Sequence, residues 1–338
     1  MNATGLSHRL DRAVCHARRT LAVPVWAFGF LGATGCGDGA DKAAGATSEV
    51  IDATLSYPAT DAEIVLEPPP VEIPAYTDMM SCWFSTWNGP DVGVTSGAFR
   101  QSPKYGHHVI VMRTNADADE FPDGTVRDCT ASDALDMTQM DPFVLPDDPV
   151  EKGLSYLDLP DGMANKLKAG DRFLVQSHWV NYEDKPVRVN DRIELDTIPI
   201  DQVETFAAPL VHTSTTFELP EGPSDVVVNC TFEEDVSLLY LLGHMHENGT
   251  AITVDYHKAD GTTERIYEVE GWTVGFRDLP PVTYYDDPFF SVKAGESFTT
   301  TCSFDNRAGH PLGFPDEMCV ATAIAFPLTV PAICDEQG

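Results

Sequence analysis

The chain has 338 residues and a hydrophobic content of 43%, so it can bury a substantial core and is not disordered throughout. This length suits two domains of ordinary size or one large domain. The formal net charge is −32, although the first 35 residues carry four Arg and a single Asp. A surface this acidic repels phosphate backbones, which excludes nucleic acid as a partner.

The N-terminus is typical of a lipoprotein signal peptide at residues 1–35. Four Arg precede the apolar stretch Leu21–Ala33, which has the length of a signal-peptide h-region and is too short to span a bilayer. Small residues then lead to Cys36, as in a bacterial lipobox, so we expect Cys36 to carry a lipid. The prediction is an exported cell-envelope lipoprotein, periplasmic or on the cell surface, that meets the membrane only through its lipid anchor. A secreted protein without a lipid is the alternative.

Residues 36–71 are rich in Gly, Ala, Asp and Pro and show little periodicity. Such a composition predicts a flexible tether between the anchor and the folded part.

The rest of the chain predicts an all-β fold of the sandwich or barrel type. Apolar and β-branched segments with partial period-two alternation are separated by turn residues. Two short segments, 131–137 and 161–170, are the helix candidates. The stretch 198–209 is a plausible seam, which would divide the fold into halves at about 72–198 and 199–338. The predicted strands lie within 107–114, 172–183, 191–200, 225–232, 237–246, 250–258, 296–304 and 319–328.

Cysteine usage fits an exported protein. Six cysteines remain once Cys15 leaves with the signal peptide and Cys36 is lipidated. An oxidising compartment favours disulfides, and the absence of CxxC pairs argues against a zinc site. The residues alone leave fifteen pairings open.

The segment "LLGHMHENGT", Leu241–Thr250, places two histidines at the end of an apolar run. Side chains two apart on a strand project to the same face, so His244 and His246 can chelate one metal ion. Met245 then points to the other face and is expected in the core. The alternative is a strand that reaches the surface and carries His by chance.

Two further histidine segments and one methionine are also candidate metal ligands. "YGHHVIVM" contains His107 and His108, which point apart on a regular strand unless the chain turns or bulges, as Gly106 allows. A lone His178 in "LVQSHWVN" would ordinarily be a satisfied buried histidine. Met318 in "FPDEMCVATAIAF" would ordinarily be core, but as a ligand it would supply a soft thioether that favours Cu(I).

Taken together, "HH", "QxH", "HxH" and "EMC" in this order resemble the copper type II, ascorbate-dependent monooxygenases. That family includes peptidylglycine α-hydroxylating monooxygenase and dopamine β-monooxygenase, and the similarity runs from about Thr77 to Cys334. It implies two tandem jelly-roll-like β-sandwich domains, an N-terminal copper domain at 72–198 and a C-terminal copper domain at 199–338. It also implies two copper ions per chain.

The resemblance assigns a role to each ligand. It implies an electron-transfer copper at His107, His108 and His178, with Gln176 nearby. It implies an oxygen-binding, catalytic copper at His244, His246 and Met318. It further implies the disulfides Cys230–Cys334 and Cys302–Cys319, which leaves Cys82 with Cys129.

The implied activity is hydroxylation of an activated C–H bond in a small organic substrate, using O2 and a reductant such as ascorbate. Three positions depart from the peptide-amidating members, which have Arg, Asn and Tyr where this chain has Leu242, Val320 and Thr322. These departures argue against peptide amidation and suggest a less polar or uncharged substrate. Met245 also replaces the more usual Thr between the two histidines.

Two other functions are compatible with the sequence. A non-catalytic copper-binding or copper-storage lipoprotein would retain some of the ligands but needs only one site. A structural β-sandwich lipoprotein for adhesion or carbohydrate binding would carry the histidines by accident.

Overall fold

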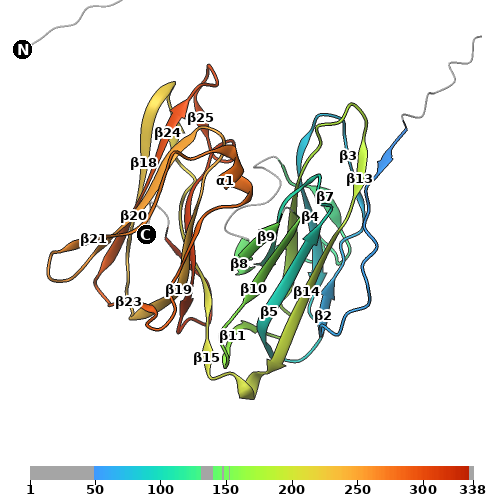
Figure 1. The fold of residues 1–338 in the computed structure, drawn as a ribbon. Coiled ribbons are helices and arrows are strands. Elements are labelled where there is room, and N and C mark those ends of the chain that lie inside the picture. The colour runs from blue at the N-terminus through green and yellow to red at the C-terminus, as the bar shows by residue number, and fades with distance from the viewer. Residues whose placement is uncertain (1–48, 131–139, 147, 152, 335–338) are drawn as a thin grey trace, which may run out of the picture. The chain divides into compact units, whose positions relative to one another are not determined.

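The computed structural model describes residues 49–130, 140–146, 148–151 and 153–334 (Figure 1). The expected signal peptide, Cys36, the beginning of the expected tether and the helix candidate 131–137 lie outside these ranges. Every described element belongs to one compact unit, residues 47–338. In the described part of the chain, no helix has both the length and the apolar character needed to cross a membrane.

The fold is all-β, as predicted, and consists of two tandem jelly-roll-like β-sandwiches. In the first sandwich, a seven-stranded and a five-stranded sheet are joined by a small three-stranded sheet. The seven-stranded sheet contains β2 (Ile64–Leu66), β5 (Val92–Gln101), β9 (Asp148–Glu151), β10 (Leu154–Asp158), β11 (Met163–Leu167), β14 (Asp191–Pro199) and β15 (Thr205–Phe206). The five-stranded sheet has the order β7 (Val126–Asp128), β4 (Asp78–Thr86), β12 (Arg172–Val180), β6 (Gly106–Thr114) and β8 (Met140–Val144). The small sheet has the order β1 (Ile51–Asp52), β13 (Val187–Val189) and β3 (Val71–Ile73).

The second sandwich pairs a six-stranded sheet with a four-stranded sheet, and a two-stranded ribbon completes it. The six-stranded sheet contains β16 (Ala208–Ser214), β19 (Val236–His244), β22 (Val282–Tyr284), β23 (Phe290–Val292), β26 (Cys319–Phe326) and β27 (Ala332–Cys334). The four-stranded sheet has the order β18 (Gly222–Thr231), β24 (Ser297–Asn306), β20 (Gly249–His257) and β21 (Thr263–Glu270). The ribbon pairs β17 (Glu218–Leu219) with β25 (Leu312–Gly313), and the helical pieces are the 3-10 turn Ile200–Gln202 and α1 (Val274–Asp278).

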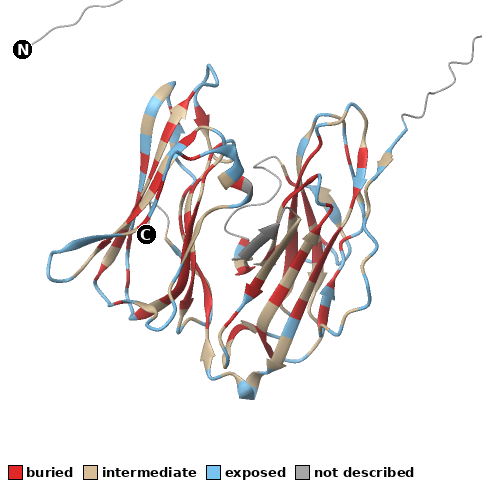
Figure 2. Ribbon diagram, viewed as in Figure 1, coloured by how far each residue is buried: buried red, intermediate tan, exposed pale blue. Residues whose placement is uncertain are grey.

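Buried and exposed positions alternate along many of the strands (Figure 2). This follows from the period-two geometry of a strand, which sends alternate side chains into the space between two sheets. Phe173 and Leu195 are buried in the first core, and Val254 and Phe298 in the second. The strands that carry the histidines are therefore fixed from behind by packed cores.

Two expectations about local structure were wrong. Part of the expected tether is ordered, because β2 pairs with β14 and buries Ile64 and Leu66. The helix candidate 161–170 forms β11, which pairs with β5. The transition between the sandwiches lies within the predicted seam, since β15 still pairs with the first sandwich and β16 with the second.

The disulfides are the two pairs that the resemblance implied and the third pair that they left. They are Cys82–Cys129, Cys230–Cys334 and Cys302–Cys319. The last one joins β24 to the start of β26, so it anchors the strand that follows Met318.

Candidate metal centre

Three histidines come together on neighbouring strands of the five-stranded sheet. His178 of β12 lies opposite His108 of β6, whereas Trp179 lies opposite Gly106, so His107 is the extra residue of a β-bulge. This bulge removes the geometric objection to adjacent histidines acting as one group. A Cβ at Gly106 would lie 2.6 Å from the Cβ of Gln101, which explains why glycine precedes the pair.

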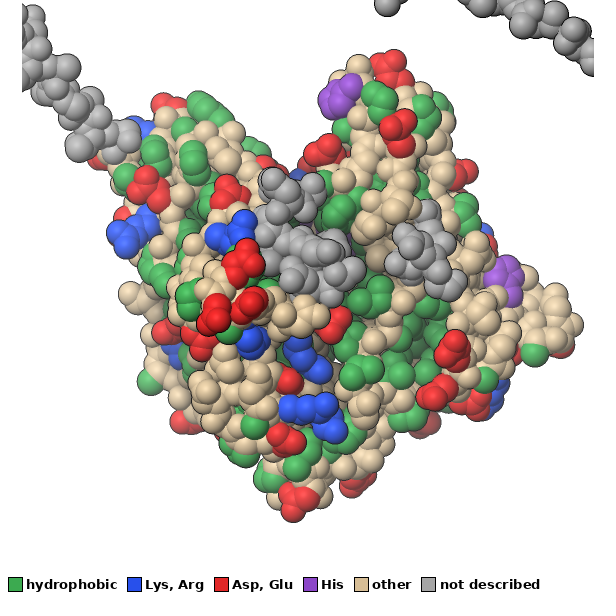
Figure 3. All heavy atoms as spheres, turned by 180° about the vertical axis from the view of Figure 1, so that it is seen from behind, with side chains coloured by type: hydrophobic (Ala, Val, Ile, Leu, Met, Phe, Trp, Pro, Cys, Tyr) green, Lys and Arg blue, Asp and Glu red, His purple; other side chains and the backbone are tan. Residues whose placement is uncertain are grey.

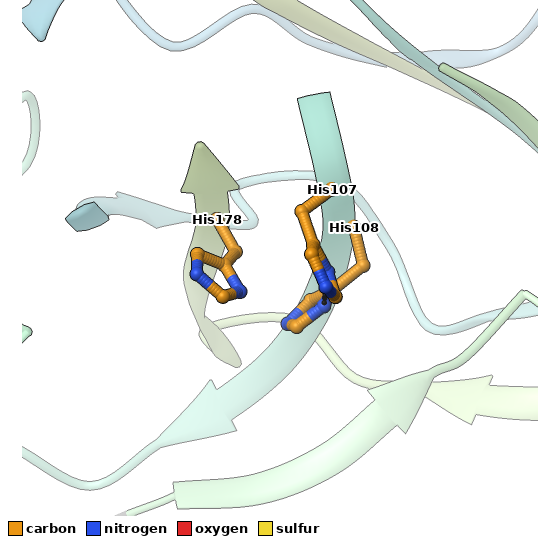
Figure 4. A group of neighbouring side chains, drawn as sticks. All are labelled: His107, His108 and His178. Carbon is orange, nitrogen blue, oxygen red and sulfur yellow. Dashed lines mark hydrogen bonds between the residues drawn. The ribbon is translucent and has the colours of Figure 1, made fainter. Parts of the chain in front are cut away.

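We call His107, His108 and His178 the three-histidine group, and Figure 4 shows their rings facing one another. Nδ1 of His107 lies 2.8 Å from Nδ1 of His108. The His107 and His178 rings stack with centroids 4.4 Å apart, and each residue offers one nitrogen within 4.8 Å of the others. Three imidazoles at this spacing can hold one metal ion.

The environment keeps this group in the form that binds metals. Burial, together with the neighbouring imidazoles, lowers the pKa of His108 well below its usual value. His108 is therefore neutral at pH 7, and only a neutral imidazole has a lone pair for a metal. His107 and His178 are buried, with 7% and 5% of their surfaces exposed, and His108 is half-buried.

Asp78, at the start of β4, orients His178. Its Oδ1 is hydrogen-bonded to Nε2 of His178, which leaves Nδ1 of His178 for the group. Burial raises the pKa of Asp78, but the hydrogen bond and charge of His178 outweigh it, so the pKa is lowered and the carboxylate is ionised. A carboxylate in this position also makes the imidazole a stronger ligand.

A second ligand set, the His-Met group, consists of His244, His246 and Met318. The rings of His244 and His246 are perpendicular, with centroids 5.2 Å apart. His244, the last residue of β19, lies opposite Val320 of β26. Met318 directly precedes Cys319, the first residue of β26, and so lies next in the chain to the strand that pairs with β19. Met245 is fully buried in the core, as predicted.

The backbone on either side of Met318 holds His246. Its Nδ1 donates to the carbonyl of Asp316 at 3.0 Å, and its backbone N–H donates to Oε2 of Glu317 at 3.1 Å. With Nδ1 engaged as a donor, Nε2 carries the lone pair that a metal would use.

The two groups approach one another. The ring centroids of His108 and His244 are 6.3 Å apart. Burial, followed by the nearby imidazoles and Arg277, lowers the pKa of His244 well below its usual value. Arg277, from α1, forms an ion pair with Glu247 and is only 8% exposed. Its positive charge also lowers the pKa of Asp78, so one cation influences both groups.

Gln176 lies on β12 two residues before His178, and side-chain alternation places it on the same face as His178. It is half-buried and lies opposite Ile110 of β6. The structure thus brings Gln176 to the strand that carries the three-histidine group.

His212 forms another grouping with Cys230 and Cys334, within 4.8 Å. The two sulfurs already form a disulfide, so they are not thiolate ligands. His212 is 2% exposed, and burial lowers its pKa to about 4. It lies against Phe298 in the second core, and we assign it a packing role.

On the face shown in Figure 3, charged side chains of one sign do not gather into a single patch. Acidic side chains are spread over the face shown in Figure 3, with Lys and Arg among them. The identification of a site therefore depends on the histidine groups.

Comparisons with known proteins give no family. No protein-family model matches the chain, and no curated protein matches it. Among solved structures, the chain is similar to a recombinant N-glycanase F (PNGase F), at 10% identity and a TM-score of 0.29, over 78% of this chain and 96% of that chain. It is also similar to a triple jelly roll protein of an archaeal virus, at 9% identity and a TM-score of 0.23, over 79% of this chain and 61% of that one. A third similarity is to the VP2 subviral particle of infectious bursal disease virus, at 11% identity and a TM-score of 0.22, over 80% and 74%. These similarities assign no function.

The sequence did not predict three residues that contact or influence the histidine groups. Asp78 and Glu317 contact histidines that are 100 and 71 residues away in the chain, and Arg277 belongs to a short helix that was not predicted. Glu317 had a local signal, because it precedes Met318 in "DEMC", whereas Asp78 and Arg277 had none.

Proposed function

We propose that the protein is a copper- and O2-dependent monooxygenase that hydroxylates an activated C–H bond of a small organic substrate. The proposal depends on one observation, which is that two ligand sets of different chemistry lie close together. The ring centroids of His108 and His244 are only 6.3 Å apart. Three imidazoles make one set, and two imidazoles with a thioether make the other. A thioether is a soft ligand that suits Cu(I), whereas imidazole suits several metals, so the His-Met group is what favours copper.

His107, His108 and His178 would hold one copper ion, and His244, His246 and Met318 the other. Copper bound there supplies one-electron redox chemistry with O2 and with a reductant such as ascorbate. The net reaction consumes R–H, O2, two electrons and two protons and gives R–OH and water. Lowered pKa values keep His108 and His244 neutral, Asp78 orients His178, and the Asp316 carbonyl orients His246.

The row of side chains beside the His-Met group on β19 and β26 favours an uncharged substrate. Residues directly opposite each other on paired strands share a face, so Leu242 and Thr322 lie on the face of His244 and Val320. Leu242 is 7% exposed, and the hydroxyl of Thr322 already donates to the carbonyl of Leu210. A substrate carboxylate finds no cation in this row, which argues against peptide amidation.

We also propose that the protein is exported and anchored through a lipid on Cys36. The three disulfides fit an oxidising compartment outside the cytoplasm. Metabolic labelling with a fatty acid should mark the wild type and not Cys36→Ser. Equal labelling of both, or of neither, would contradict the anchor.

Copper stoichiometry tests the proposed function. The exported chain, reduced with ascorbate under anaerobic conditions, should bind two copper ions. His108→Ala should lose one ion, and Met318→Ala should lose the copper–sulfur scattering in X-ray absorption. His257→Ala is the matched control, because His257 is hydrogen-bonded to Thr263 and Thr299 and belongs to neither group. It should still bind two ions.

Oxygen uptake then separates an enzyme from a carrier. With ascorbate, a hydroxylase should consume O2 in proportion to an uncharged substrate and form its alcohol. One bound copper without turnover would instead establish a copper-binding or storage protein, and no bound copper would end the metal hypothesis.

A further inference from the structure

Glu317 is a charged side chain in an unusual place. It is fully buried, with 0% of its surface exposed, and lies directly before Met318. Burial of a carboxylate is costly unless hydrogen bonds replace the lost water. Packing alone would be satisfied by an apolar residue, so the bonds made by Glu317 indicate its purpose.

All three hydrogen bonds recorded for this carboxylate come from one turn. Oε2 accepts from the backbone N–H of His246 at 3.1 Å. Oε1 accepts from the backbone N–H of Asn248 at 2.7 Å and from its side-chain amide at 2.8 Å. The turn that follows β19 is therefore fixed to the segment that precedes β26.

Three successive residues thus act on one histidine. The carbonyl of Asp316 accepts from the imidazole of His246, the carboxylate of Glu317 accepts from its backbone, and Met318 is the next residue of the same segment. Without Glu317, the bond from the His246 imidazole to the Asp316 carbonyl would be left to hold this turn against the segment that carries Met318.

We propose that Glu317 is a positioning residue that sets the distance between His246 and Met318, and so creates the softer of the two copper sites. The inference rests on the proposed function, because it gives a role toward the copper ligands. Glu317 touches neither the metal nor the substrate, and it acts through the backbone of His246.

The substitution that tests this is Glu317→Gln in the exported chain. Glutamine has the same shape but only one acceptor oxygen, so it cannot satisfy both His246 and Asn248. The Cu(I) affinity of each site is measured by competition with a chromophoric Cu(I) chelator. Affinity at the His-Met group should fall about ten- to a hundred-fold, as for other residues that orient ligands, with weaker copper–sulfur scattering. The three-histidine group should keep its affinity.

Glu296→Gln is the matched control for a purely structural role. Glu296 is also buried and accepts from Lys293, Ala259 and Tyr256, none of which is a proposed ligand. This variant should lower the melting temperature and leave both Cu(I) affinities within about two-fold. In a His246→Ala background, Glu317→Gln should cause no further loss at the His-Met group.

Three results would overturn the role of Glu317: unchanged affinities in Glu317→Gln, an equal loss at both sites, or the same loss in Glu296→Gln. If Glu317→Gln does not fold, Glu317→Asp replaces it, since aspartate keeps the charge but cannot span His246 and Asn248. A wild type that binds fewer than two copper ions would instead refute the proposed function itself, so the two failures are distinguishable.

Discussion

Replacing Asp191 with Asn should remove a large pH-dependent loss of stability. Asp191 begins β14, pairs with Gln101 of β5 and is only 4% exposed. Burial raises its pKa to about 7, although hydrogen bonds from Ser177 and Gln101 act in the opposite direction. Ser177 precedes His178, so this carboxyl group also supports the strand of the three-histidine group.

The magnitude follows from the difference between the folded and unfolded pKa values. A pKa raised from the ordinary value of 3.8 to about 7 means that the folded state holds its proton more tightly than the unfolded chain does. The resulting stability is present below about pH 4 and is lost as the pH rises through about 7. At about 1.4 kcal/mol for each pKa unit, the loss is about 4 kcal/mol.

Urea unfolding at a series of pH values from 4 to 8, in the presence of a metal chelator, measures this effect. The stability of Asp191→Asn relative to wild type should rise by about 4 kcal/mol across that range. Asp196→Asn, an exposed position on the same strand, controls for the loss of one negative charge. A difference between Asp191→Asn and wild type that stays constant with pH would refute the argument from burial.

Three further outcomes are expected. Asp78→Asn should weaken copper binding at the three-histidine group about ten-fold or more, measured by Cu(I) competition, because His178 loses the carboxylate that orients it. Gly106→Ala should destabilise the fold by about 1–3 kcal/mol in urea, because the new methyl group would lie 2.6 Å from the Cβ of Gln101. In the chelated protein, the contribution of His108 to stability should fall below about pH 6.5, in opposition to the gain from Asp191, since unfolded His108 takes up a proton that the folded residue refuses. His108→Ala should reduce that acid dependence, and an unchanged dependence would contradict the burial of the imidazole.

Much of the fold followed from the sequence, because each buried strand carries its own period-two pattern. The segments around His107, His178 and His244 all became strands, as predicted. The segment 161–170 misled because Met163, Ala164 and Leu167 are spaced as on one face of a helix. Pairing of β11 with β5 overrides that local preference.

The strand within residues 49–71 could not be predicted from the sequence for a similar reason. The strand β2 has only three residues and is followed by three prolines, so its alternation is too short to detect. Its stability comes from pairing with β14, more than 120 positions further along the chain. Local composition cannot contain that information.

The candidate ligands were identified by residue type and spacing, whereas their partners were not. Spacing of two predicts that His244 and His246 share a face, because that rule depends only on strand geometry. Asp78 and Glu317 act through tertiary contacts, and a carboxylate that orients a histidine looks like any other acidic residue in so acidic a chain.

The difference between the two groups is what argues for chemistry over storage. A storage protein gains capacity from similar sites and has no use for one set of three imidazoles beside another with a thioether. Each set here has its own orienting contacts, from Asp78 in one case and from Asp316 and Glu317 in the other. A redox enzyme needs such independent control, because one site must exchange electrons while the other must accept O2 and substrate. The row that contains Leu242 and Val320 beside His244 carries no charged side chain, which favours an uncharged substrate.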